Sequence, residues 1–397
     1  MNEEISAAKA PLEFDPAGPL AGIRVVALEQ SVAGPIASRI LADMGADVIK
    51  VEPPHGDFSR QWDSHVHGYS SHFTWLSRRK RSIALNLHEA EQRAIFERLL
   101  ATADVLIFNP TVAAARRLGL TPERLRRDHP RLVACQISGY GRTGETSGRK
   151  AYDMLLQAEA GLLSLTGDDA GPVRVGVSIA DIGTGIYAST LILGALYERP
   201  RTSVGRFIDL SMFEAMTEFV GPNLTAYANS GVRYMRNRNR HHNIVPYGIF
   251  ECRDGYISIA VEQDSEWQVF CNVVLQRADL AKRTEFATNE RRVARRSEVE
   301  AEIEREMAAR TRLEWQERLD GAALGYGIIN DIAGVWNHQI ETDLELHGST
   351  LMPDGTSASV PVSPAERAFG QVTASEVPSL DQHRAEIMSE LNQELVG

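Results

Sequence analysis

The first half of the chain alternates short apolar runs with stretches of helical spacing. Residues 23–29 (IRVVALE) form an apolar, β-branched run, and apolar positions then recur at helical spacing over 36–44. Pro35 suits the first turn of this helix, Gly45 suits its end, and 47–51 (DVIKV) is a second apolar run. This order predicts strand, turn, helix and strand, which is typical of the opening of a parallel α/β sheet.

The same alternation continues as far as residue 210. It predicts further strands at 82–86, 104–108, 132–137 and 205–210, and helices at 89–100, 153–163 and 182–197. Strands that alternate with helices in this way favour an α/β fold with a parallel sheet.

The pattern changes after about residue 226. A basic, polar loop at 233–243 precedes two strands at 247–252 and 256–261, which flank a tight-turn signal, and charged helices follow over 290–319. We therefore expect a smaller α+β domain here. The expected division is an N-terminal arm at 1–18, a large domain at 19–225, a small domain at 226–325, and a C-terminal segment at 326–397 that returns to the large domain.

Charge excludes some partners. The 397 residues carry a net charge of −11, so the chain has no general attraction for nucleic acid or for an anionic membrane surface. No uninterrupted apolar run reaches the ~18 residues of a membrane helix, and the first residues lack the basic end and apolar stretch of a secretory signal. We expect a cytoplasmic protein without a membrane segment.

The three cysteines, Cys135, Cys252 and Cys271, are far apart in the sequence. This spacing matches neither a disulfide framework nor a zinc site. We expect buried, inert thiols in a reducing compartment and no bound metal.

Asp181 is the first candidate for chemistry. It lies in the segment SIADIGTG, directly before an apolar helix. Aspartate is a favoured N-cap residue, which is one interpretation. The alternative is a nucleophile: Gly183 and Gly185 would let a ligand approach closely, and the helix N-terminus would keep the carboxylate ionised and hold an oxyanion.

Several other polar segments have two interpretations each. Asp153, in the segment KAYD, is either an N-cap or a partner in the site, and the neighbouring Lys150 either pairs with a phosphate or is solvated. The basic run at 78–81 (RRKR) and the pair at 116–117 are either solvated surface or anion sites. The cationic loop at 233–242 suits an anionic acyl group, and its candidate residues are Arg238, Arg240, His241 and His242.

A glycine-rich segment at 139–144 (GYGRTG) follows a predicted strand. A dinucleotide site also needs a helix that begins at these glycines, and the next residues, ETSGRK, are a poor helix start. A flexible loop near a ligand is favoured, and a nicotinamide-dependent oxidoreductase remains an alternative. The sequence contains neither a G-x-S-x-G elbow nor a Walker A loop.

The order of these segments resembles the class III CoA-transferase (CaiB/BaiF) family from about residue 19 to about residue 380. The resemblance is carried by PLAGIRVVALEQSVAGPIASRILADMGADVIKVEPP, KRSIALN, ADVLIFNP, ISGYG, KAYD, SIADIGTG, GALYER and the segment around IDLSMFEAM. Within the family, KAYDMLLQAEAG and HHNIVPYGIF are most similar to transferases of C4–C5 dicarboxylates such as mesaconate, citramalate, itaconate and succinate.

The resemblance implies a Rossmann-like large domain, a small α+β domain and an interlocked homodimer. It also implies that Asp181 attacks an acyl-CoA thioester to give a mixed anhydride and then an aspartyl-CoA thioester, which passes CoA to a carboxylic acid. No metal or tightly bound cofactor is expected, because coenzyme A and acyl-CoA are the substrates.

The family's functional residues fall on defined positions here. CoA contacts are implied for Val32, Ala33, Leu85, Asn86, His88, Asn109, Arg117 and Lys150, and supporting roles for Tyr152, Asp153, Gly183 and Gly185. Two departures are Pro53, where many relatives have arginine, and 109–113 (NPTVA), where relatives often read NFRPG. We expect Arg78 or Arg81 to supply the missing phosphate contacts.

The family also contains α-methylacyl-CoA racemases, which are the second alternative. They use a histidine just before the helix-starting aspartate. The segment KAYD has no histidine, and deprotonation of an α-carbon needs two opposed proton carriers.

Overall fold

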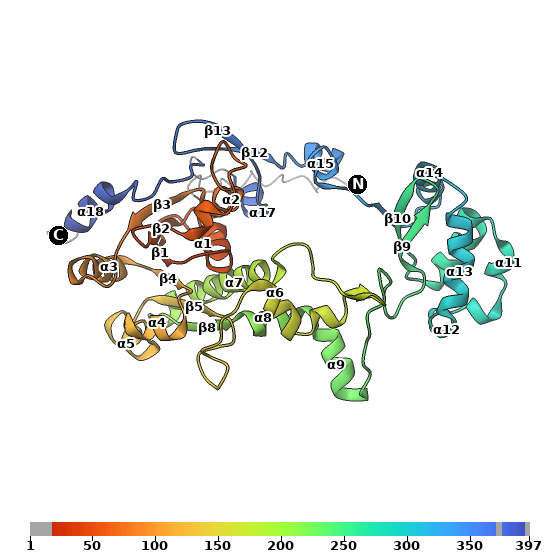
Figure 1. The fold of residues 1–397 in the computed structure, drawn as a ribbon, viewed down its shortest axis with the longest axis horizontal. Helices are drawn as coiled ribbons and strands as arrows, with labels where there is room; N and C mark the ends of the chain where they lie inside the picture. Colours follow the sequence, from red (N-terminus) through yellow and green to blue (C-terminus); the bar gives the residue numbers. More distant parts are fainter. Residues whose placement is uncertain (1–17, 371–374, 394–397) are drawn as a thin grey trace, which may run out of the picture. The chain divides into compact units, whose positions relative to one another are not determined.

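The computed structural model describes residues 18–370 and 375–393 (Figure 1). Their contacts form two compact units. The small unit is Gly161–Arg174 together with Pro222–Gln339, and the large unit contains the other described residues. The segment 161–174 was expected in the large domain. It joins the small unit because Arg236 Nε donates to the carbonyl of Asp168 at 3.1 Å and Arg238 pairs with Asp169.

A six-stranded parallel sheet is the framework of the large unit, which confirms the predicted α/β fold. The strand order β3-β2-β1-β4-β5-β8 reverses direction between β1 and β4. In open parallel sheets, ligands bind at such a switch point, beyond the carboxyl ends of the strands. The strands are β1 (Arg24–Leu28), β2 (Asp47–Glu52), β3 (Lys80–Ala84), β4 (Val105–Phe108), β5 (Val133–Ser138) and β8 (Phe207–Ser211).

Apart from the short α16 (Gln339–Asp343), ten α-helices of the large unit are described, and Figure 1 shows several of them over the sheet. They are α1 (Ala33–Asp43), α2 (Ser71–Ser77), α3 (Ala90–Thr102), α4 (Val112–Arg117), α5 (Pro122–Asp128), α6 (Asp153–Glu159), α7 (Ile179–Thr202), α8 (Met212–Phe219), α17 (Pro364–Phe369) and α18 (Arg384–Gln393). The apolar face of α3 packs against fully buried strand residues such as Val26 and Leu106.

Helix α7 packs closely against α1 at Gly185 and against α8 at Gly183. A Cβ at Gly185 would lie 2.5 Å from Ile36 Cγ2, and a Cβ at Gly183 would lie 2.6 Å from the Phe219 ring. Protein interiors leave no room for such overlaps. The two glycines after Asp181 therefore serve packing, and their supporting role in the site stays a prediction.

The same helix is long and apolar enough, by length and composition, to pass a test for a membrane span. Gly, Ser and Thr interrupt its apolar run, so the sequence shows no uninterrupted apolar stretch of this length. Core helices of soluble proteins pass this test too, and the face of α7 that carries Gly185 and Ile192 is buried against the rest of the large unit.

The basic run at 78–81 is neither a solvated surface nor a phosphate site. Arg79 Nη2 pairs with Glu366 of α17 at 2.7 Å, and Arg81 Nη1 pairs with Glu390 of α18 at 2.6 Å. Carboxylates 287 and 309 residues away thus pair with these cations and hold the C-terminal segment against the sheet. The expectation that Arg78 or Arg81 contacts phosphate is wrong, because both guanidinium groups form ion pairs inside the large unit.

The small unit contains a three-stranded antiparallel sheet in the order β11-β10-β9. Its strands are β9 (Tyr247–Cys252), β10 (Gly255–Ala260) and β11 (Tyr326–Ile328), and the first two form the hairpin predicted at 253–255. Helices α10 (Asp264–Val269), α11 (Ala278–Ala281), α12 (Asn289–Ala294), α13 (Arg296–Met307) and α14 (Arg312–Gly321) cluster beside this sheet in Figure 1. The fully buried Trp267 and Trp315 are the largest side chains of its core.

Shorter elements complete the described chain. They are the two-residue strands β6 (Gly167–Asp168) and β7 (Gly171–Pro172), the helices α9 (Gly221–Ser230), α15 (Ile332–Trp336) and α16 (Gln339–Asp343), and the hairpin of β12 (His347–Leu351) with β13 (Ser357–Pro361).

All three cysteines are buried and free, as predicted. Burial raises the pKa of the Cys135 and Cys271 thiols to about 12. A thiol with so high a pKa forms almost no thiolate at neutral pH and is therefore inert.

Candidate active site

Asp181 is the third residue of α7 and lines a cavity of about 290 Å³ in the large unit. The helix begins at Ile179, three residues earlier than the sequence pattern indicated. The cavity wall combines the loop after β1, the loop after β4, the loop after β5 and the start of α6. Its lining includes Ser31, Ala33, Phe58, Thr111, Ser138, Lys150, Tyr152, Asp153 and Met212.

Asp153 caps a different helix from the one that it begins. The N-cap of α6 is Tyr152, which makes no side-chain capping bond. The buried Asp153 carboxylate instead accepts a hydrogen bond from the N–H of Ala180 at 2.8 Å and another from Gln157 Nε2 at 2.7 Å. It therefore fixes the first turn of α7 directly beside Asp181.

The pKa of Asp181 is raised to about 7 by burial and, second, by the charge of Asp153. The expectation that the helix N-terminus keeps this carboxylate ionised is therefore wrong. The first donors of the helix do not offset these effects, because the N–H of Ile179 bonds to Val177 O and the N–H of Ala180 bonds to Asp153. Neither group is free to stabilise the charge of Asp181 or an oxyanion.

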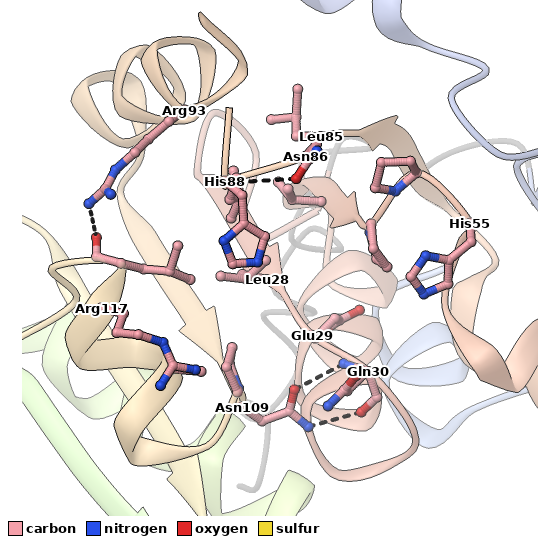
Figure 2. A pocket seen from close by; sticks show the side chains of 17 residues that line it. Leu28, Glu29, Gln30, His55, Leu85, Asn86, His88, Arg93, Asn109 and Arg117 are labelled. Carbon is pink, nitrogen blue, oxygen red and sulfur yellow. Dashed lines mark hydrogen bonds between the residues drawn. The ribbon is translucent and has the colours of Figure 1, made fainter. Parts of the chain in front are cut away.

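A larger cavity, of about 690 Å³, opens at the switch point of the sheet (Figure 2). It lies beyond the carboxyl ends of β1, β2, β3 and β4, which is the position expected for a nucleotide in this type of fold. Its lining includes Leu28, Glu29, Gln30, Pro53, His55, Leu85, Asn86, His88, Arg93, Asn109, Pro110 and Arg117.

The two cavities share a wall. Gln30, Asn109 and Pro110 line both of them. Asn109 is held in place by a reciprocal pair of 2.9 Å bonds, because its Oδ1 accepts from the Gln30 N–H and its Nδ2 donates to the Gln30 carbonyl (Figure 2). A long ligand that fills the larger cavity can therefore extend past the Asn109–Gln30 pair towards Asp181.

A family model described as CoA-transferase family III matches residues 20–384. The chain belongs to this family. It is 34% identical to a succinate–glutarate CoA-transferase of Agrobacterium fabrum, over 94% of this chain and 96% of that protein. It is 32% identical to a succinyl-CoA:mesaconate CoA-transferase of Haloarcula marismortui, with the same coverage.

Among solved structures, a CaiB/BaiF family protein from Brucella suis is 34% identical and has a TM-score of 0.80 over 94% of this chain and 99% of that one. The resemblance inferred from the sequence motifs is thus confirmed, and the protein is a class III CoA-transferase.

The implied CoA-contact residues of this CoA-transferase fall into three groups. Leu85, Asn86, His88, Asn109 and Arg117 line the larger cavity. Ala33 and Lys150 line the Asp181 cavity, together with the supporting residue Tyr152. The Val32 side chain is buried against Ile36 and Leu76 instead.

The candidate substrate residues of the cationic loop lie in the small unit. Arg240 pairs with Glu304 at 2.7 Å, and Arg238 pairs with Asp169 at 3.1 Å. The His241 ring stacks on Tyr247, and His242 bonds to the carbonyl of Met235. Their part in substrate binding stays a prediction.

Two residues of the site were missed. Gln157 is completely buried and connects two groups. Its Nε2 donates to Asp153, and its Oε1 accepts a hydrogen bond from the backbone N–H of Val175 at 3.0 Å. The spacing of Asp153 and Gln157, four residues apart on one helix, was the available signal. His55 lines the larger cavity, and nothing in the sequence distinguishes it from other loop histidines.

The glycine-rich loop does not have the form of a dinucleotide site. It follows β5 rather than β1, and no helix begins between Gly139 and Lys150. A Cβ at Gly139 would lie 2.1 Å from Ala151 Cβ, so this glycine allows close packing of two loop segments. In the described ranges, 18–370 and 375–393, no three His, Cys, Asp or Glu side chains are grouped as metal ligands.

Proposed function

We propose that this enzyme moves CoA between dicarboxylic acids and that Asp181 is the covalent nucleophile. The observation that carries the proposal is the shared wall: the Asp181 cavity and the nucleotide-sized cavity meet at Gln30 and Asn109. The nucleotide of CoA would occupy the larger cavity, and the thioester would lie beside Asp181.

The first half of the reaction loads the enzyme. A carboxylate oxygen of Asp181 attacks the thioester carbonyl of the donor, the C–S bond breaks, and CoA leaves as a thiolate, which gives an aspartyl mixed anhydride. The thiolate then attacks the Asp181 carbonyl of the anhydride. The donor acid leaves as a carboxylate, and an aspartyl-CoA thioester remains.

The second half reverses these steps with another acid. The acceptor carboxylate attacks the aspartyl thioester, releases the thiolate and forms a new anhydride. The thiolate attacks the acceptor's acyl carbon, and Asp181 leaves as a free carboxylate. Each step exchanges one acyl bond for another, so the reaction needs no redox partner.

The raised pKa of Asp181 suits this chemistry. A carboxylate in a buried site, near the charge of Asp153, is poorly stabilised and therefore more nucleophilic than one in water. The capping bond from Ala180 to Asp153 fixes the position of the helix turn, so that the nucleophile is held in place for attack.

Two observations support dicarboxylates as the substrates. The relatives named above act, by their names, on succinate with glutarate or mesaconate. The exposed Lys150, which lines the same cavity as Asp181, can pair with the free carboxylate of a dicarboxylyl group. The C4–C5 acids mesaconate, citramalate, itaconate and succinate remain our proposed acceptors.

We also propose that the enzyme is a homodimer of interlocked chains in the cytoplasm. Helix α7 exposes Ile186, Leu191 and Tyr197, which are apolar side chains that a second chain could cover. The free cysteines fit a reducing compartment. Sedimentation velocity and cell fractionation test these two points separately.

The decisive experiment traps the intermediate. Wild-type enzyme is incubated with succinyl-CoA and hydroxylamine and analysed by peptide mass spectrometry, with Asp181→Asn as the control. We expect a hydroxamate at Asp181 in the wild type, none in the variant, and loss of turnover in the variant. Normal turnover by Asp181→Asn would contradict the proposal. The α-deuteration of acyl-CoA in heavy water without an acceptor would also contradict it and would favour a racemase.

A further inference from the structure

The larger cavity contains an unusual set of positively charged or titratable side chains. Arg117 from α4, His88 from the loop after β3 and His55 from the loop after β2 all line it. Figure 2 shows the His88 ring between Arg117 and His55. Arg93 lines the cavity too, but its Nη2 donates to the carbonyl of Leu118 at 2.8 Å.

The acidic groups nearby are already occupied. Glu29 also lines the cavity, but its carboxylate accepts bonds from Lys80 at 2.8 Å and Ser38 at 2.6 Å. Glu89, next to His88 in the sequence, accepts bonds from the side chains of Asn86 and Gln92. In the part of the chain that the structure describes, no carboxylate pairs with either imidazole or with Arg117.

The cavity therefore has one permanent cation without an ion-pair partner, Arg117, and two exposed imidazoles. Histidine is the side chain whose charge ordinarily changes between about pH 5 and pH 8. The nucleotide of CoA carries a phosphomonoester and a diphosphate. One guanidinium cannot balance these charges, and Arg78 and Arg81, which might have assisted, are held in internal ion pairs.

We propose that His55 and His88 bind a phosphate of the CoA nucleotide in their protonated form, so that the enzyme binds CoA more tightly as the pH falls. This inference rests on the proposed function, which assigns the cavity to the nucleotide. Bound phosphate is an anion that accepts charge-assisted hydrogen bonds from an imidazolium, so it favours the protonated ring. CoA binding is then coupled to proton uptake.

Calorimetric titration with CoA tests the coupling. The titrations are made at pH 6 and pH 8 in the Asp181→Asn background, which removes the titration of the nucleophile and any turnover. We expect the background protein to bind CoA about fivefold more tightly at pH 6. At an intermediate pH, the binding enthalpy should change with the ionisation enthalpy of the buffer. The sign of this change should show that the complex takes up protons from the buffer.

Matched variants assign the effect to the two histidines. His55→Gln combined with His88→Gln should reduce the pH dependence to less than about twofold. His65→Gln, which changes an exposed histidine outside the cavity, should retain the full dependence. The titration of CoA itself is the same in every protein, so the comparison between proteins isolates the imidazoles.

The two possible failures are distinguishable. If the double histidine variant keeps the pH dependence of its parent, the inference is overturned while the CoA site stands. If CoA does not bind at all, the assignment of the cavity to the nucleotide is itself wrong. The same follows if Arg117→Gln binds CoA as tightly as its parent protein does at both pH values.

Discussion

The carboxylate of Asp153 caps the helix that carries Asp181. It accepts the N–H of Ala180, one residue before Asp181, at 2.8 Å, and its charge contributes to a pKa of about 7 at Asp181. One acidic group thus fixes the position of another and also makes it harder to ionise. The packing and the electrostatics of α6 and α7 therefore lead to testable predictions.

The first concerns the pH dependence of acylation. Only the carboxylate form of Asp181 attacks, so the single-turnover rate should rise with pH, reach half its maximum near pH 7 and then level off. At pH 6 the rate should be about tenfold below the plateau. Rapid quenching with saturating succinyl-CoA measures it, and a rate that is flat from pH 5 to pH 8 would contradict the raised pKa.

Asp153→Asn should shift that midpoint to lower pH. The amide oxygen of asparagine can still accept the Ala180 N–H, but the negative charge that opposes ionisation of Asp181 is gone. Glu159→Gln is a suitable control, because it removes a carboxylate from the same helix whose partner is the exposed Arg149. A wild-type midpoint in both variants would show that the charge of Asp153 does not raise the pKa of Asp181.

The second prediction concerns stability. The pKa of Asp181 is higher in the folded protein than in the unfolded chain, so the folded state binds its proton more tightly between about pH 4 and pH 7. The contribution of Asp181 to the free energy of unfolding therefore falls as the pH rises through this window. Asparagine does not titrate, so Asp181→Asn should be about 1–3 kcal/mol more stable than wild type at pH 8.

Thermal unfolding at a series of pH values measures this difference. It should shrink to almost nothing clearly below pH 4, where the aspartate is protonated in both states. Equal stability of the two proteins at pH 8 would show that burial does not disfavour the charge.

The third prediction concerns Gln157. Leucine in its place would leave one acceptor of Asp153 and the N–H of Val175 without their partner in a buried site, at a cost of about 1–3 kcal/mol in unfolding free energy. It should also move the pH midpoint of acylation, since Asp153 loses a donor that stabilises its charge. Gln268→Leu, at an exposed position of α10, should change neither quantity.

The variant Gln157→Glu tests whether Gln157 acts by donating a hydrogen bond to Asp153 or only by filling space. Glutamate has nearly the same shape but cannot donate while ionised, so it should repel Asp153 and raise the midpoint of Asp181 further. A role for Gln157 in packing alone would leave the midpoint of both Gln157 variants at the wild-type value.

The fourth prediction compares two glycines of α7. Gly185→Ala would place a Cβ 2.5 Å from Ile36 and 2.8 Å from the carbonyl of Ala33, so it should destabilise the fold by about 1–3 kcal/mol. Gly194→Ala meets nothing within 4 Å and should stabilise it by about 0.5–1 kcal/mol, because alanine favours the helix. Urea unfolding measures both, and equal effects would contradict the close packing of α7 on α1.

The amino-acid pattern alone predicted the six strands of the large sheet, the helices α1, α3, α6 and α7, the position of Asp181 near the start of a helix, and the family. These features are local, because an apolar period of two or 3.6 residues is set by neighbours along the chain. Boundaries were less certain: α7 begins at Ile179 instead of residue 182, which places Asp181 inside the first turn.

Only the tertiary structure decided what the charged residues do. Arg79 finds Glu366, Asp153 caps a helix that begins 26 residues later, and the ionisation of Asp181 is set by burial and by Asp153. Ion pairs, caps and pKa values depend on distances between segments that are remote in the sequence. A pattern of neighbours along the chain does not contain those distances.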